Sequence, residues 1–290
     1  MKSCKIHSLF LAFVLLMLTT ACSNDTEQPT EGSATLNFRI LNFQQVSLDE
    51  VTRATNAETL DHLDMAIYQA ATHALVSNTQ TAKGSENYGS FSATLPFGDY
   101  NIVFLGYNGS RTAQLTSPES IQFADFYVPD FFYKTLPLSV NASTNLEQNI
   151  SLARAVAAFT IRGEGYIPTN TQDMTITAKG GGQVFNALTG KAAETADMTR
   201  SYNMSSKAGG TSFGINFYTF LPATESTMDF TVTAYDTKGG ELAKRTFNDV
   251  SMKINQRSIF SGAFFGNGEA ASAFNISLEN PEWDDVEHTY

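Results

Sequence analysis

Apolar and polar residues alternate one by one in many short runs along the chain beyond residue 33. In residues 34–41, Leu36, Phe38 and Ile40 are separated by polar neighbours. Turn residues separate the alternating runs, and no stretch shows helical amphipathicity over three turns. A period of two is typical of half-buried strands, so the pattern predicts an all-β chain of antiparallel sheets packed as β-sandwiches. The other runs are residues 62–68, 88–95, 100–107, 131–140, 146–152, 155–161, 173–178, 213–221, 227–236, 242–247, 258–265 and 274–278.

These strands are too many for one sandwich, so we expect two tandem domains. A chain of 290 residues accommodates that number. Residues 151–163, SLARAVAAFTIRG, read as the last strand of one domain running into the first strand of the next. We therefore expect an N-terminal sandwich over residues 34–153 and a C-terminal sandwich over residues 154–290.

The first 21 residues have the layout of a signal peptide. Lys2 and Lys5 precede the apolar block 9–18, and small residues follow up to Ala21. The apolar block is too short for a membrane-spanning helix, which needs about 20 residues. Cys4 leaves with this segment, so Cys22 is the only cysteine expected in the exported chain. An intramolecular disulfide is then excluded.

The position of Cys22 resembles that of the modified cysteine in bacterial lipoproteins, although Thr19 stands where the usual motif has leucine. The resemblance implies acyl chains on the sulfur and nitrogen of Cys22, and several chains hold a protein firmly on a membrane. An ordinary signal peptide cut near Ala21 is the alternative. Residues 22–33 are polar and acidic and predict a lipidated, flexible leash. Their acidic residues resemble surface-export signals, although a plain soluble linker has the same composition.

Composition and motifs argue against several function classes. The net charge is -11, and it becomes -13 once the leader, with its two lysines, is removed. Such an acidic surface disfavours nucleic acid and anionic lipid as partners. His62, between Asp61 and Asp64, has no zinc-ligand spacing and is expected to face solvent at a strand start. The glycines of residues 179–183 are expected to form a hairpin turn. We expect no enzyme and no catalytic, metal or cofactor site.

A glycan-binding surface lipoprotein is the alternative function. Sugar platforms are commonly built from exposed aromatic residues, and residues 125–134, DFYVPDFFYK, are rich in them. Alternation, however, places Phe131 and Tyr133 on one face of a strand and Phe132 on the other, as a strand buried on both sides requires. The single tryptophan, Trp283, lies in the terminal residues 280–290.

Several features in order resemble the fimbrillin and fimbrial-anchor lipoproteins of Bacteroides-type bacteria, which are tandem transthyretin-like sandwiches. They are the lipoprotein leader, the tripeptide at residues 52–54, LPFGDYNIVFLGYN at residues 95–108 and SLARAVAAFTIR at residues 151–162. The resemblance spans nearly the whole exported chain. It implies a structural fimbrial protein, lipid-anchored at the outer membrane and exposed on the cell surface, where it supports adhesion to a host or bacterial surface ligand. Its partners would be other fimbrial subunits.

In that family a subunit that lacks one strand accepts an extended segment of its neighbour, which is β-strand addition. Repeating this contact without closure builds a filament. The resemblance implies that the strand carrying Leu36, Phe38 and Ile40 is the donor or exchanged strand. It also implies that an arginine-specific protease could cut between Arg53 and Ala54, which would release the lipid and this strand together. An uncut chain would be an anchor or minor subunit, the role we favour, and a cut chain would be a shaft or tip subunit.

Overall fold

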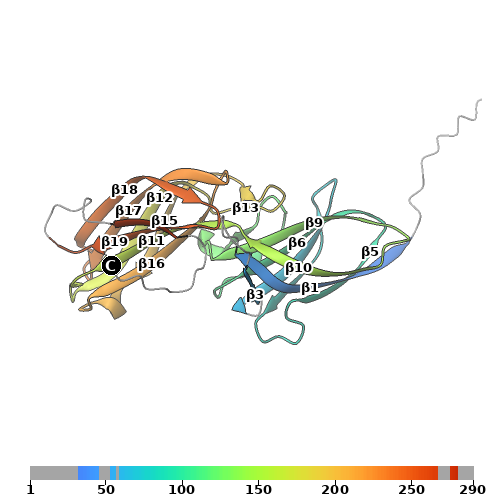
Figure 1. Cartoon of the computed structure of the whole chain (residues 1–290), viewed down its shortest axis with the longest axis horizontal. Coiled ribbons are helices and arrows are strands. Elements are labelled where there is room, and N and C mark those ends of the chain that lie inside the picture. The colour runs from blue at the N-terminus through green and yellow to red at the C-terminus, as the bar shows by residue number, and fades with distance from the viewer. Residues whose placement is uncertain (1–31, 46–52, 57–58, 267–274, 280–290) are drawn as a thin grey trace, which may run out of the picture.

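The protein is all-β in a computed structural model that describes residues 32–45, 53–56, 59–266 and 275–279. Its strands form an N-terminal half, from β1 to β10, and a C-terminal half, from β11 to β20, which lie end to end (Figure 1). The described helical segments are short 3-10 turns such as η2 (Ala124–Phe126) and η3 (Ser205–Lys207). No helix in the described part of the chain is long and apolar enough to cross a membrane.

The N-terminal half is one eight-stranded sheet in the order β2-β1-β10-β9-β6-β3-β4, with β5 paired to β1. β10 and β9 pair only at Ala153–Tyr133 and Arg154–Phe132. The sheet therefore folds over on itself, and an apolar core fills the space between β5-β1-β10 and β9-β6-β3. The main strands are β1 (Ser33–Gln45), β2 (Arg53–Asn56), β3 (His62–Gln69), β4 (Leu75–Ala82), β5 (Ser90–Pro96), β6 (Gly98–Tyr107), β9 (Phe131–Val140) and β10 (Leu146–Arg154).

The C-terminal half is a sandwich of two four-stranded sheets, ordered β16-β11-β19-β20 and β15-β12-β17-β18. Phe159 and Phe230, one from each sheet, stack with ring centroids 4.1 Å apart at the centre of the core. Burying such aromatic pairs is a large part of what stabilises a sandwich. The strands are β11 (Val156–Glu164), β12 (Thr171–Gly181), β15 (Ala196–Asn203), β16 (Ser212–Phe220), β17 (Glu225–Asp236), β18 (Glu241–Lys253), β19 (Arg257–Ala263) and β20 (Asn275–Glu279).

A third apolar cluster joins the two halves. It covers the other face of β3, of most of β6 and of the start of β9, so β3 and most of β6 are buried on both sides. Phe131 contributes its ring to this cluster, packed edge-on against Phe185 and Phe220 of the C-terminal half at 5.1 and 5.4 Å. The short hairpins β7 (Ala113–Gln114) with β8 (Gln122–Phe123), and β13 (Phe185–Asn186) with β14 (Lys191–Ala192), complete its cover.

A buried ion pair stands where β10 runs into β11. The Arg154 guanidinium donates from Nε and Nη2 to the two carboxylate oxygens of Asp130 at 2.7 and 3.1 Å. Its Nη1 also donates to the Asn255 Oδ1 at 3.0 Å, and the guanidinium lies 4.6 Å from the centre of the Phe132 ring. We name these four residues the Arg154 clasp. The clasp connects β10 to the turn before β19 and so ties the halves together by polar contacts.

Two parallel strand pairs correct the expectation of purely antiparallel sheets. β1 pairs with β10, and β11 with β19, in parallel. Alternation reports which face of a strand is buried, but it carries no information about the direction of the neighbour. Parallel partners are distant in sequence because they need a crossover connection, and about 110 residues separate Leu36 from its partner Leu146.

Seven strands and a glycine run also differ from expectation, and five of these strands, β2, β7, β8, β13 and β14, are only two to four residues long. β4 and β15 were not predicted, since both present mainly exposed, polar residues on both faces. Gly180 and Gly181 end β12 in a bulge, where Ala178 pairs with Met198 and Gly181 with Ala196. Lys179, Gly180 and Gly181 therefore belong to a strand, whereas Gly182 forms an isolated bridge with Phe220 and Gln183 lies in a bend. Gly180, with φ of 92°, needs the conformational freedom of glycine.

Asp64 is a fully buried acid on β3 that holds a loop against the sheet. Its carboxylate accepts hydrogen bonds from the Tyr107 hydroxyl at 2.7 Å, the Gln80 Nε2 at 3.0 Å and the Thr81 N–H at 3.2 Å. The Tyr107 oxygen in turn accepts from the Ala113 N–H at 3.1 Å. Burial raises the pKa of Asp64 above its ordinary value of 3.8, despite these hydrogen bonds.

Asp64→Asn is therefore expected to change how stability depends on pH. The unfolded carboxyl ionises near pH 3.8, whereas the folded one keeps its proton to higher pH. Asp64 therefore contributes a loss of stability to the wild type as pH rises from 3.8 to the raised pKa of the folded state, and this contribution is absent from Asp64→Asn. Urea unfolding at several pH values between 3.5 and about 7 should show the wild type falling relative to the variant. A difference that does not vary with pH would contradict this assignment.

Candidate functional site

The candidate site is β1 and its two flanking strands, β5 and β10. Leu36, Phe38 and Ile40 all point into the core and are at most 5% exposed. They are matched to Leu146, Gln148 and Ile150 on β10, and Leu36 and Phe38 are matched to Ala93 and Phe91 on β5. The expected exchanged strand is thus a central strand, paired along both edges.

Side chains as well as the backbone hold β1 in its position between β5 and β10. The Phe38 ring packs edge-on against Phe104 of β6 with centroids 5.1 Å apart, and Phe91 packs on the same ring at 6.4 Å. On the opposite face the Thr35 and Thr94 hydroxyls are 3.0 Å apart. A segment held by two ladders and by alternate apolar side chains has the geometry that β-strand addition reproduces in trans.

Arg53 and Ala54 begin β2, an edge strand whose backbone pairs only with β1 among the described strands. Arg53 lies opposite Gln45, and Ala54 opposite Gln44. All of β1 precedes Arg53 in the sequence, so breaking the bond between Arg53 and Ala54 would separate β1 covalently from β5 and β10. Cys22, the expected lipidation site, lies outside the described residues.

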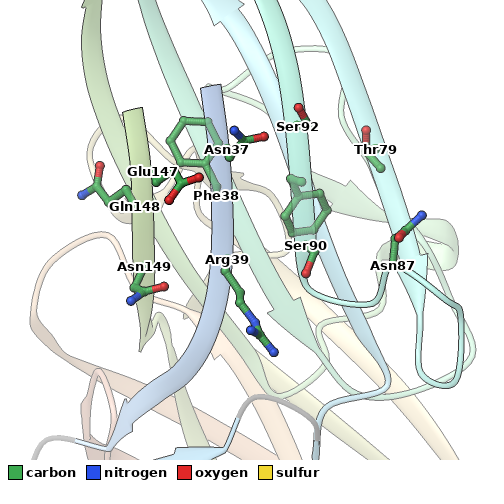
Figure 2. A pocket seen from close by; sticks show the side chains of 11 residues that line it. Asn37, Phe38, Arg39, Thr79, Asn87, Ser90, Ser92, Glu147, Gln148 and Asn149 are labelled. Atoms are coloured by element: carbon green, nitrogen blue, oxygen red, sulfur yellow. The ribbon is translucent and has the colours of Figure 1, made fainter. Parts of the chain in front are cut away.

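The outer face of the same three strands carries a polar trough. The strand register aligns Ser92, Asn37 and Glu147 in one row, and Ser90, Arg39 and Asn149 in the next. Figure 2 shows β1 in the middle, β10 on one side and β5 on the other, with Asn87 and Thr79 beyond β5. We name these eight residues the polar trough. Phe38, Phe91 and Gln148 complete its lining, and the volume that these residues enclose together is about 690 Å³, which is within the range of about 300–1,000 Å³ for small-ligand sites.

The trough offers hydrogen-bonding side chains of mixed character. It holds one guanidinium, one carboxylate, three side-chain amides and three hydroxyls. Within the described residues, none of the six side chains in the two rows makes an intramolecular hydrogen bond or ion pair. Sequence reasoning did not identify this site, because its rows depend on the pairing of strands far apart in the chain.

The aromatic run at residues 125–134 does not form the exposed platform that the glycan-binding alternative would need. Phe131 is buried between the two halves and Phe132 in the N-terminal core, which confirms that they point to opposite faces of β9. The guanidinium groups of Arg111 and Arg200 lie 4.6 and 4.7 Å from the centre of the Tyr127 ring. Phe126 alone among them is prominently exposed, at 51%. Trp283 lies outside the described residues.

His62 makes structural contacts at the start of β3. Its ring stacks on Tyr107 with centroids 4.8 Å apart, and its Nε2 lies 3.0 Å from the Gly109 carbonyl oxygen. No group of three or more potential metal ligands occurs among the residues that the structure describes.

Comparisons with known proteins place this geometry in context. No curated protein matches the chain. A solved candidate adhesin of Bacteroides ovatus is similar over 86% of this chain and 87% of its own, with 11% identity and a TM-score of 0.51. A second candidate adhesin of Bacteroides ovatus is similar over 85% and 95%, with 12% identity and a TM-score of 0.50. The fimbrial anchor protein Mfa2 of Porphyromonas gingivalis is similar over 86% and 98%, with 12% identity and a TM-score of 0.43.

The family comparison is the more specific one. Residues 127–288, more than half of the chain, match one family along the last strands of the N-terminal half and nearly all of the C-terminal half. The chain therefore belongs to the family described as "Family of unknown function (DUF6562)".

Proposed function

We propose that the chain is a cell-surface fimbrial protein, an anchor or minor subunit, that joins other subunits by β-strand addition and supports adhesion. The observation that carries this proposal is the position of β1. It is the first described strand of the chain, it is paired along both edges, and it sends Leu36, Phe38 and Ile40 into the core. The fold shared with the two candidate adhesins supports the proposal.

The anchor role is supported by β1 of the chain itself lying between β5 and β10, as long as Arg53 stays uncut. A subunit whose acceptor groove is empty can bind an extended segment of its neighbour. A subunit whose groove is already filled by its own strand can only donate a segment to a neighbour. The chain would therefore stand at one end of a filament. The proposal also includes acyl chains on Cys22, a leader that ends at Ala21 and two tandem transthyretin-like sandwiches with a boundary at residues 153–154. Arg53 remains uncut in the anchor role.

A disulfide that locks β1 in place distinguishes the anchor role from the role of a shaft subunit. Thr35 and Thr94 are directly opposite on β1 and β5, with hydroxyl oxygens 3.0 Å apart, so Thr35→Cys with Thr94→Cys places two thiols within bridging reach. An anchor keeps β1 throughout, so the locked chain should still copurify with filaments from the producing bacterium. A shaft subunit must release β1, so the locked chain would be lost from filaments.

The matched control is Thr175→Cys with Ser201→Cys. These residues are opposite one another on β12 and β15, with hydroxyl oxygens 3.3 Å apart, and are far from β1 in the topology. This lock should leave filament association unchanged in either role. Absence of the wild-type chain from every filament fraction would refute the fimbrial function itself.

A further inference from the structure

We propose that the polar trough is a binding site for an uncharged, hydroxyl-rich ligand, a short stretch of neutral glycan, and that it exists only while β1 is seated. The first step is the composition of its walls. Amides and hydroxyls both donate and accept hydrogen bonds, and Arg39 adds a set of donors and Glu147 a pair of acceptors. A ligand covered with hydroxyl groups presents the same mixture.

The second step is the availability of these groups. Asn37, Arg39, Ser90, Ser92, Glu147 and Asn149 are exposed, and none has an intramolecular side-chain partner within the described residues. The floor is formed by the backbones around Phe38 and Phe91, whose rings point inward and fix the strands that carry the two rows. The paired strands fix the backbone positions from which these side chains project, so the spacing of the two rows is set before a ligand binds.

The third step distinguishes this ligand from a peptide or a polyanion. An added peptide strand uses the unpaired backbone of a sheet edge, whereas the backbone of β1 under the trough is already paired with β10 and β5. A highly charged ligand gains little, because Arg39 and Glu147 are the only charged residues lining the trough and have opposite signs. The side chains and the volume together favour a neutral oligosaccharide.

The fourth step is the link to β1. Asn37 and Arg39, the middle of each row, belong to β1, so a chain without β1 lacks the centre of the site. A ligand that binds only the form with β1 seated stabilises that form. Binding itself does not depend on the proposed fimbrial role, and protection of β1 by the ligand matters only in a chain that is cut after Arg53.

The test uses the full exported chain and four probes, measured by titration calorimetry: maltohexaose, xylohexaose, mannohexaose and the polyanion polygalacturonate. We expect at least one neutral hexasaccharide to bind. Asn37→Ala combined with Arg39→Ala should weaken that binding by about tenfold or more, the effect of losing about 1.4 kcal/mol. Asn248→Ala, an exposed asparagine on β18, is the matched control and should bind like the wild type.

Three outcomes would overturn the proposal: no hexasaccharide binds, only polygalacturonate binds, or the double variant binds as well as the wild type.

A second experiment adds an arginine-specific protease and follows cleavage after Arg53 by mass spectrometry, with and without the hexasaccharide that binds. Slower loss of β1 with the sugar is the expected result if cleavage occurs, and an unchanged rate would refute the link to β1. Failure of the fimbrial role would leave the binding result intact.

Discussion

Phe38→Ala is expected to lower the free energy of unfolding of the N-terminal half by about 3–5 kcal/mol. The Phe38 side chain is 3% exposed and packs edge-on against Phe104 at 5.1 Å, so its removal leaves a cavity between β1 and β6. The effect should appear as an earlier transition in urea unfolding of the exported chain. Since Phe38 belongs to the strand that the proposed function concerns, the variant should also release β1 more readily.

Phe126→Ala is the matched control for this substitution. It removes the same ring from a side chain that is 51% exposed and outside the described cores, so stability should change by less than about 0.5 kcal/mol. Similar losses for the two variants would mean that β1 is not packed as described. If Phe38→Ala lost much stability but retained β1 as well as the wild type does, packing of Phe38 would not control the release of β1.

Arg154→Ala is expected to cost about 3–5 kcal/mol, because it leaves a partly buried carboxylate without its partner. The Arg154 side chain is 2% exposed and that of Asp130 15%, and two hydrogen bonds join them. The clasp connects β10 with the turn before β19 through Asn255. We therefore expect the two halves to unfold less cooperatively in the variant, with calorimetric transitions that move apart.

A double-mutant cycle with Asp130→Asn isolates the pair from the separate effect of each side chain. Asp130→Asn removes the charge that Arg154 leaves behind, so the double variant should be more stable than the sum of the two single losses predicts. Arg154→Lys keeps the charge but loses the bidentate hydrogen bond. Its stability should lie between those of the wild type and Arg154→Ala. Purely additive losses would contradict the clasp.

Alternation was sufficient to predict much of the fold, because burial on one face is a property of each strand alone. Leu36, Phe38 and Ile40 were expected on one face of a strand and lie together in the core. The connection from β5 to β6, at Phe97, is equally local. β6 starts at Gly98, with φ of 152°, and the Tyr100 hydroxyl donates to the Pro96 carbonyl at 3.0 Å.

Features that depend on distant partners were not accessible from the sequence. β4 carries polar residues on both faces, since it is an edge strand paired only with β3 in the described sheet, and its pattern is that of a loop. The parallel pairing of β1 with β10 is set by packing across the fold. The polar trough follows from that pairing, because Asn37 meets Glu147, and Arg39 meets Asn149, only in this register.

The most direct test of the central claim is mass spectrometry of the chain recovered from isolated filaments of the producing bacterium. The account predicts a chain that begins at an acylated Cys22, retains β1 and residues 46–53, and copurifies with other fimbrial subunits. A filament-bound chain that begins at Ala54 would contradict the anchor role. Recovery of the chain only from fractions that lack filaments would contradict assembly by strand addition.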